Sequence, residues 1–172
     1  MNEEARQRRF SLTPFQRKLV LAVHIIVSVG LLGDSAGYLA VAIRGAATSD
    51  PNLATASYQM LQMFAFVFGI PLSFAALITG ALLGFGTRWG VFRYPWVTTK
   101  LLLILSVIAV GGLVLSGGMT AMLTGAGGAE GQLIAGAAYD VVALAAATTL
   151  AVFKPGGPWG RGRSRTAHPS AG

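Results

Sequence analysis

Four long apolar stretches dominate the sequence and limit the folds that it can adopt. Each stretch reaches the roughly 20 residues that an α-helix needs to cross about 30 Å of hydrocarbon. The chain is 53% hydrophobic and 11% charged, whereas soluble domains are about one quarter charged. We therefore predict an all-α integral membrane bundle of four transmembrane helices, at about 19–43, 53–85, 97–115 and 131–153.

The basic residues alternate between the two sides of these spans. Eleven Lys and Arg residues lie in segments 1–18, 86–96 and 154–172, and the two other connections hold only Arg44. Because basic residues of short flanking segments stay in the cytoplasm, we predict that both termini are cytoplasmic, in the inner membrane of a bacterial cell. Segment 1–18 is then a basic N-terminal segment, and 154–172 is a disordered basic tail.

The same distribution argues against a nucleic-acid partner, although the formal net charge is +7. No face of the chain alternates basic residues with stacking aromatic residues. The absence of cysteine excludes disulfides, thiolate metal sites and cysteine nucleophiles. The expected partner is the lipid bilayer, and a second copy of the chain or another membrane protein stays open as a further partner.

Two local features are expected within this scheme. Pro71 should kink the second span, because proline lacks a backbone donor and clashes with the preceding turn. The glycine-rich stretch 117–131 is expected to be an outer loop, and it holds no lysine that would indicate a phosphate-binding loop.

An outer layer of polar side chains is predicted inside the membrane. Asp34, Gln62 and Asp140 each lie nine residues from the outer end of their span, and therefore at similar depth, with Tyr38 close to Asp34 in sequence. A carboxylate in hydrocarbon must be protonated, paired or hydrated. We interpret this layer as a shared-proton or cation site in which Asp34 and Asp140 face each other or share a partner such as Gln62. The alternative is that these groups only hold helices together.

An inner layer contains His24 and Lys100, which lie five and three residues from the cytoplasmic ends of their spans. Intramembrane ionisable residues normally face the bundle interior, and a neutral imidazole is a good metal ligand. His24 is therefore a candidate cofactor ligand. Two plainer interpretations stay open, in which His24 packs between helices and Lys100 extends to the headgroups.

Two methionine pairs lie near the outer side of the predicted bundle. Met60 with Met63, and Met119 with Met122, are spaced i, i+3, which places both sulfurs of a pair on one helix face. Thioethers suit Cu(I), so these four residues are a candidate copper site. Pairs of this kind also arise by chance in an apolar protein.

Part of the chain resembles a known group of proteins. The run TGALLGFGTRWG at 79–90, followed by YPWVTTKL at 94–101, is similar to small actinobacterial membrane proteins of unknown function. That group looks like a branch of the superfamily of CopD-type copper-resistance proteins and HemJ-type protoporphyrinogen oxidases, with His24 and the pair Trp96 and Lys100 as shared cues over about residues 14–153. The HemJ resemblance implies b-type haem, with His24 as an axial ligand and Lys100 as a site residue. The CopD resemblance implies periplasmic copper handling.

Three functions therefore stay open. The chain is a haem-binding redox protein, a carrier of copper or another cation that uses the outer Asp, Gln and Met residues, or a non-catalytic membrane interaction subunit. Only one of the two histidines lies within a span, so one copy of the chain cannot ligate haem with two histidines from its own helices. Whether the protein is an enzyme does not follow from the sequence.

Overall fold

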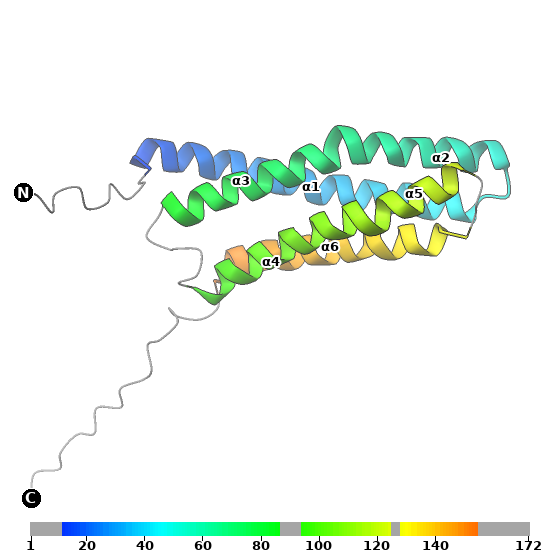
Figure 1. Ribbon diagram of the computed structural model, residues 1–172. Coiled ribbons are helices and arrows are strands. Elements are labelled where there is room, and N and C mark those ends of the chain that lie inside the picture. The colour runs from blue at the N-terminus through cyan, green and yellow to red at the C-terminus, as the bar shows by residue number, and fades with distance from the viewer. Residues whose placement is uncertain (1–11, 87–93, 125–127, 155–172) are drawn as a thin grey trace, which may run out of the picture.

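The computed structural model describes residues 12–86, 94–124 and 128–154. Within these ranges, four stretches are long and apolar enough to cross a membrane: Pro14–Ala47, Pro51–Gly86, Pro95–Met122 and Glu130–Phe153. Figure 1 shows them side by side, with the first helix beginning and the last helix ending at the same end of the bundle. We call this the terminal end, and the opposite end, where the first span connects to the second, the distal end.

The first span is one continuous helix, α1 (Pro14–Ala47). Its first turn is closed by a capping box, in which the Thr13 hydroxyl accepts the Gln16 N–H and the Gln16 side chain accepts the Thr13 N–H. At 34 residues the helix is longer than the predicted 19–43. Such a helix is about 51 Å long, so its ends extend beyond a hydrocarbon layer of about 30 Å.

The second span contains three segments: α2 (Pro51–Met63), the π-helical turn η2 (Phe64–Gly69) and α3 (Ile70–Gly86). The irregularity expected at Pro71 takes the form of this π turn, which ends two residues before the proline. A wider turn accommodates the proline ring and the missing donor. In Figure 1 the span changes direction between α2 and α3.

The third span contains α4 (Pro95–Val110), a second π-helical turn η3 (Gly111–Leu115) and α5 (Ser116–Leu123). The prediction that an outer loop begins at residue 117 was wrong, because the helix continues to Leu123. Glycine does not break a helix where water is absent and cannot compete for the backbone groups. The Thr120 hydroxyl also donates to the Ser116 carbonyl at 2.9 Å.

The fourth span is the helix α6 (Glu130–Phe153), which packs against α1 and α4, while α1 also packs against α2 and α3. Buried side chains form two clusters. The distal core contains Tyr38, Ala42, Tyr58, Leu61, Met119, Leu133 and Ala137. The terminal core contains Leu31, Ala76, Val107, Ala143 and Leu144. Many other large apolar side chains are exposed, such as Phe66 and Leu113, which suits helices that face lipid.

Candidate functional site

A polar layer lies between the two apolar cores. On α1, Asp34 lies between Leu31 of the terminal core and Tyr38 of the distal core. On α6, Asp140 likewise lies between residues of the two cores. The π turns η2 and η3 occupy the corresponding stretch of the second and third spans. All four spans therefore depart from a regular apolar helix at one level of the bundle.

The two carboxylates of this layer lie around one phenol. Tyr38 is 5% exposed and Asp140 is 6% exposed, and Asp34 is half-buried one helical turn from Tyr38. The Tyr38 phenol is close enough to interact electrostatically with both Asp34 and Asp140. Gln62, which was predicted for the same layer, lies on the exposed face of α2. The neighbour common to the two carboxylates is therefore Tyr38.

Three oxygen atoms of the layer are buried without a hydrogen-bond partner among the described residues: Asp34 Oδ1, Tyr38 Oη and Asp140 Oδ1. Buried polar atoms are almost always paired, and an unsatisfied one costs about 1–3 kcal/mol. Three orphaned oxygens on two helices, with the Tyr38 phenol near both carboxylates, are a costly arrangement for a site that only holds helices together. Chemically, such oxygens can accept a proton or act as ligands of a cation.

Gly69 leaves space for the Asp34 carboxylate. A Cβ atom at Gly69 would lie 3.3 Å from Asp34 Oδ2 and 3.7 Å from the Phe64 carbonyl oxygen. A carboxylate oxygen and a backbone carbonyl of η2 therefore border the same small space. π turns occur frequently at functional sites, and carbonyl groups of irregular helices coordinate cations in membrane carriers. The sequence hinted at this feature only through the pair Gly69 and Pro71.

Contacts between α6 and the third span orient Asp140. The Tyr139 hydroxyl donates to Ser106 Oγ at 2.6 Å, which connects α6 to α4. The Gln132 side chain donates to the Val114 carbonyl of η3 at 3.0 Å, so this π-turn carbonyl has a partner. These bonds hold the side of α6 that carries Tyr139 and Gln132 against the third span, while Asp140 faces the interior.

His24 and Lys100 lie together nearer the terminal end. The His24 Nδ1 atom is 2.9 Å from Thr79 Oγ1, and the Thr79 hydroxyl is 2.6 Å from the Ala75 carbonyl. The single hydroxyl proton of Thr79 serves Ala75, so the imidazole Nδ1–H donates to Thr79 and Nε2 keeps its lone pair. Gly80 makes room for the ring, since a Cβ there would lie 3.3 Å from His24 Cε1. Lys100 of α4 interacts electrostatically with His24.

The two methionine pairs have different surroundings. Met60 and Met63 are 48% and 49% exposed on α2, whereas Met119 is 7% exposed in the distal core and Met122 packs against that core. One pair therefore faces outward and the other faces the bundle. The copper site stays a prediction.

The comparisons with known proteins identify a family. A family model described as predicted integral membrane protein (DUF2269) matches residues 18–155, a range that includes nearly all of the four spans. No curated protein and no solved structure matches the chain. The kinship with CopD- and HemJ-type proteins stays a prediction. The chain belongs to the DUF2269 family and is a multi-pass integral membrane protein.

Proposed function

We propose that the protein is a carrier that binds a proton or a small monovalent cation between Asp34 and Asp140 and moves it across the membrane. The observation that supports this proposal most strongly is the group of three buried, unpartnered oxygens in the polar layer. Two carboxylates in hydrocarbon need a compensating positive charge, which a shared proton or a bound cation supplies. The Tyr38 hydroxyl supplies a donor to a carboxylate or an oxygen ligand to a cation.

The composition of the layer favours a singly charged ligand. Divalent calcium takes six to eight oxygen ligands, and its protein sites are rich in carboxylates. Within the ranges that the structure describes, no group of three or more His, Cys, Asp or Glu residues could hold a metal ion. Two carboxylates, one phenol and the nearby Phe64 carbonyl suit a proton or an alkali cation better. Binding near mid-membrane beside irregular helices is also the arrangement of many secondary transporters, a similarity by analogy only.

The setting that we propose is the cytoplasmic membrane of a bacterium, with both termini in the cytoplasm. The support is the distribution of basic residues, eleven on one side of the spans and Arg44 alone on the other. In this orientation the distal end faces outward, and the polar layer separates an inner terminal core from an outer distal core.

The test uses purified protein in liposomes that contain a dye sensitive to protons, Na⁺ or K⁺, according to the gradient imposed. Imposed proton, Na⁺ and K⁺ gradients should drive a flux that Asp34→Asn and Asp140→Asn each reduce at least tenfold. Glu130→Gln, which removes a carboxylate at the first turn of α6, is the control and should keep the wild-type flux. Wild-type liposomes that are as tight as empty ones under all three gradients would overturn the proposal.

A second candidate, haem binding at His24, is favoured by one specific observation. His24 donates Nδ1–H to Thr79 and keeps a lone pair on Nε2. Histidines that bind metals commonly donate their other ring N–H in this way, which fixes the tautomer. His24 could supply one axial ligand of a haem iron, and the described spans hold no second histidine for the other. Bound haem would supply one-electron chemistry, and the absorption spectrum of protein purified from a haem-replete membrane tests for it.

A further inference from the structure

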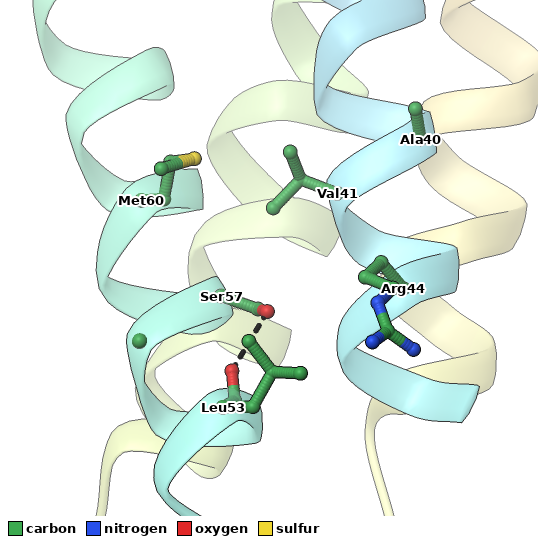
Figure 2. A pocket seen from close by; sticks show the side chains of 7 residues that line it. Ala40, Val41, Arg44, Leu53, Ser57 and Met60 are labelled. Carbon is green, nitrogen blue, oxygen red and sulfur yellow. Dashed lines mark hydrogen bonds between the residues drawn. The ribbon is translucent and has the colours of Figure 1, made fainter. Parts of the chain in front are cut away.

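We infer that a groove between α1 and α2 at the distal end binds an anionic phospholipid, with one acyl chain in the groove and the phosphate on Arg44. The groove has a volume of about 340 Å³ and is formed on the α1 side by Ala40, Val41 and Arg44. Figure 2 shows these residues across the groove from α2. Ligand sites range over about 300–1,000 Å³, so the volume suffices for part of a lipid chain. This inference is independent of the cation site.

The walls of the groove suit hydrocarbon. The α2 side presents Leu53, Ala56 and Met60, and the hollow exists partly because Ala56 and Ala40 are small. The only hydroxyl group of the wall belongs to Ser57, and it donates to the Leu53 carbonyl at 2.8 Å (Figure 2). Apart from the Arg44 guanidinium at one end, the side chains of the wall therefore need no polar ligand.

The groove opens toward the membrane. Ala40 and Ala56 are exposed, and Met60 is 48% exposed. Toward the distal end the two helices come close together, because a Cβ atom at Gly45 would lie only 3.0 Å from the Ser57 Cβ atom. An acyl chain can thus enter from the bilayer at the side, along the α1–α2 boundary.

Arg44 supplies the charge that selects the headgroup. Its side chain is exposed, and none of the described residues forms a salt bridge with it. Figure 2 shows the guanidinium group near Leu53, at the level where α2 begins its first turns. Asp50, the acidic residue that follows in sequence, accepts the Asn52 N–H at 2.9 Å as the cap of α2. A guanidinium binds phosphate oxygens in a bidentate manner, so a lipid phosphate is the complementary group.

The position of Arg44 also determines which leaflet of the bilayer supplies the lipid. Arg44 is the only basic residue of the sequence that flanks a span at its distal connection, whereas the other flanking basic residues belong to segments 1–18, 86–96 and 154–172. A lipid held by Arg44 therefore belongs to the leaflet at the distal end. The headgroup lies at the interface and the chain runs from Arg44 toward Met60, along the groove.

The experiment is native mass spectrometry of the detergent-solubilised full chain. Phosphatidylglycerol and phosphatidylcholine with identical acyl chains are added in equal amounts. We expect the wild type to retain one phosphatidylglycerol molecule per chain about tenfold more than phosphatidylcholine, and Arg44→Gln to lose this preference. The basic residues of segments 1–18, 86–96 and 154–172 can also attract anionic lipid. The informative quantity is therefore the number of bound phosphatidylglycerol molecules, which should be one lower in Arg44→Gln than in the wild type.

A matched pair of variants tests the groove itself. Met60→Trp fills it, whereas Met63→Trp places the same side chain one turn away, at a position with nearly the same exposure, 49% against 48%. We expect the first variant to lose the lipid and the second to keep it. Equal retention by the two variants, an unchanged preference in Arg44→Gln, or displacement of the lipid by equimolar glycerol phosphate would each overturn the inference.

A measurement on the wild type covers the case in which a variant fails to fold. Phosphatidylglycerol with a photoactivatable group on its acyl chain is added to the protein and irradiated. The cross-linked peptide should contain the stretch from Leu53 to Met60. Cross-links that leave this stretch unmodified, while other segments react, would also overturn the inference.

Discussion

Replacing Asp140 with leucine separates a functional carboxylate from a structural one. Asp140 is 6% exposed, and its Oδ1 atom is without a partner among the described residues. Replacing a buried polar group with an apolar group of similar shape can be neutral or stabilising, because the unsatisfied atom disappears. From the 1–3 kcal/mol that one such atom costs, we expect Asp140→Leu to raise the free energy of unfolding by about 1–2 kcal/mol. The proton or cation flux should be lost in the same variant.

The assay is thermal unfolding in detergent micelles, followed by circular dichroism. For a chain of this size, each kcal/mol corresponds to about 2–4 °C, so the melting temperature should rise by roughly 2–8 °C. Ala137→Leu is the matched control, because it introduces the same side chain almost one turn earlier on α6 at a position that is 1% exposed. That variant overpacks the distal core and should lower stability by about 1–3 kcal/mol.

The opposite result would refute the reasoning. If Asp140→Leu lowered the free energy of unfolding by about 2 kcal/mol or more, the Asp140 carboxylate would make an interaction that stabilises the bundle. The polar layer would then hold helices together, as in the non-catalytic interaction subunit that the sequence also allows.

Four further predictions address the rest of the chain. Gly69→Ala should displace the Asp34 carboxylate, whose Oδ2 atom would lie 3.3 Å from the new Cβ, and should reduce flux several-fold, whereas Gly33→Ala, with nothing within 4 Å, should not. If haem is bound, the purified protein should show a Soret band that His24→Ala loses, and a colourless folded protein that refuses haemin would exclude this role. If copper is bound, the wild type should hold one Cu(I) per chain. A folded variant in which leucine replaces Met60, Met63, Met119 and Met122 should hold none. Reporter fusions at residues 47 and 165 should lie on opposite sides of the membrane, and signals on the same side would contradict the four-span topology.

The fold was predictable because one physical constraint decides it. Backbone groups in hydrocarbon must bond within the segment, so an apolar run of sufficient length becomes a helix. The four long apolar helices of the described residues followed from this rule. The end of the third span did not follow, because the glycines predict a loop from residue 117, whereas the helix continues to Leu123. Glycine has a strong preference for loops only where water can bond to the exposed backbone.

The depth of the polar side chains in the bundle was predictable from the sequence, but the direction in which each side chain points was not. Counting residues along a span gives the level of a side chain, and Asp34 and Asp140 do lie between the two cores. Counting does not say which way a side chain points, because successive residues are about 100° apart around a helix. Leu61 is fully buried and Gln62, next to it, is exposed. A π turn shifts this phase further, because it adds a residue to one turn of the helix.

The positions of the two cores indicate which conformational change the proposed carrier requires. The distal core lies on one side of the polar layer and the terminal core lies on the other, so a cation bound at Asp34 and Asp140 would lie between two groups of buried side chains. Transport then requires that one core opens while the other stays closed, since simultaneous opening would leave a continuous leak. The π turns η2 and η3 lie at the level where such an opening would divide the second and third spans into two halves. Because a π turn interrupts the regular bonding pattern of a helix and occurs frequently at functional sites, this level is where we expect one half of a span to shift relative to the other. The same irregular level of the bundle would thus serve as the binding site and as the hinge.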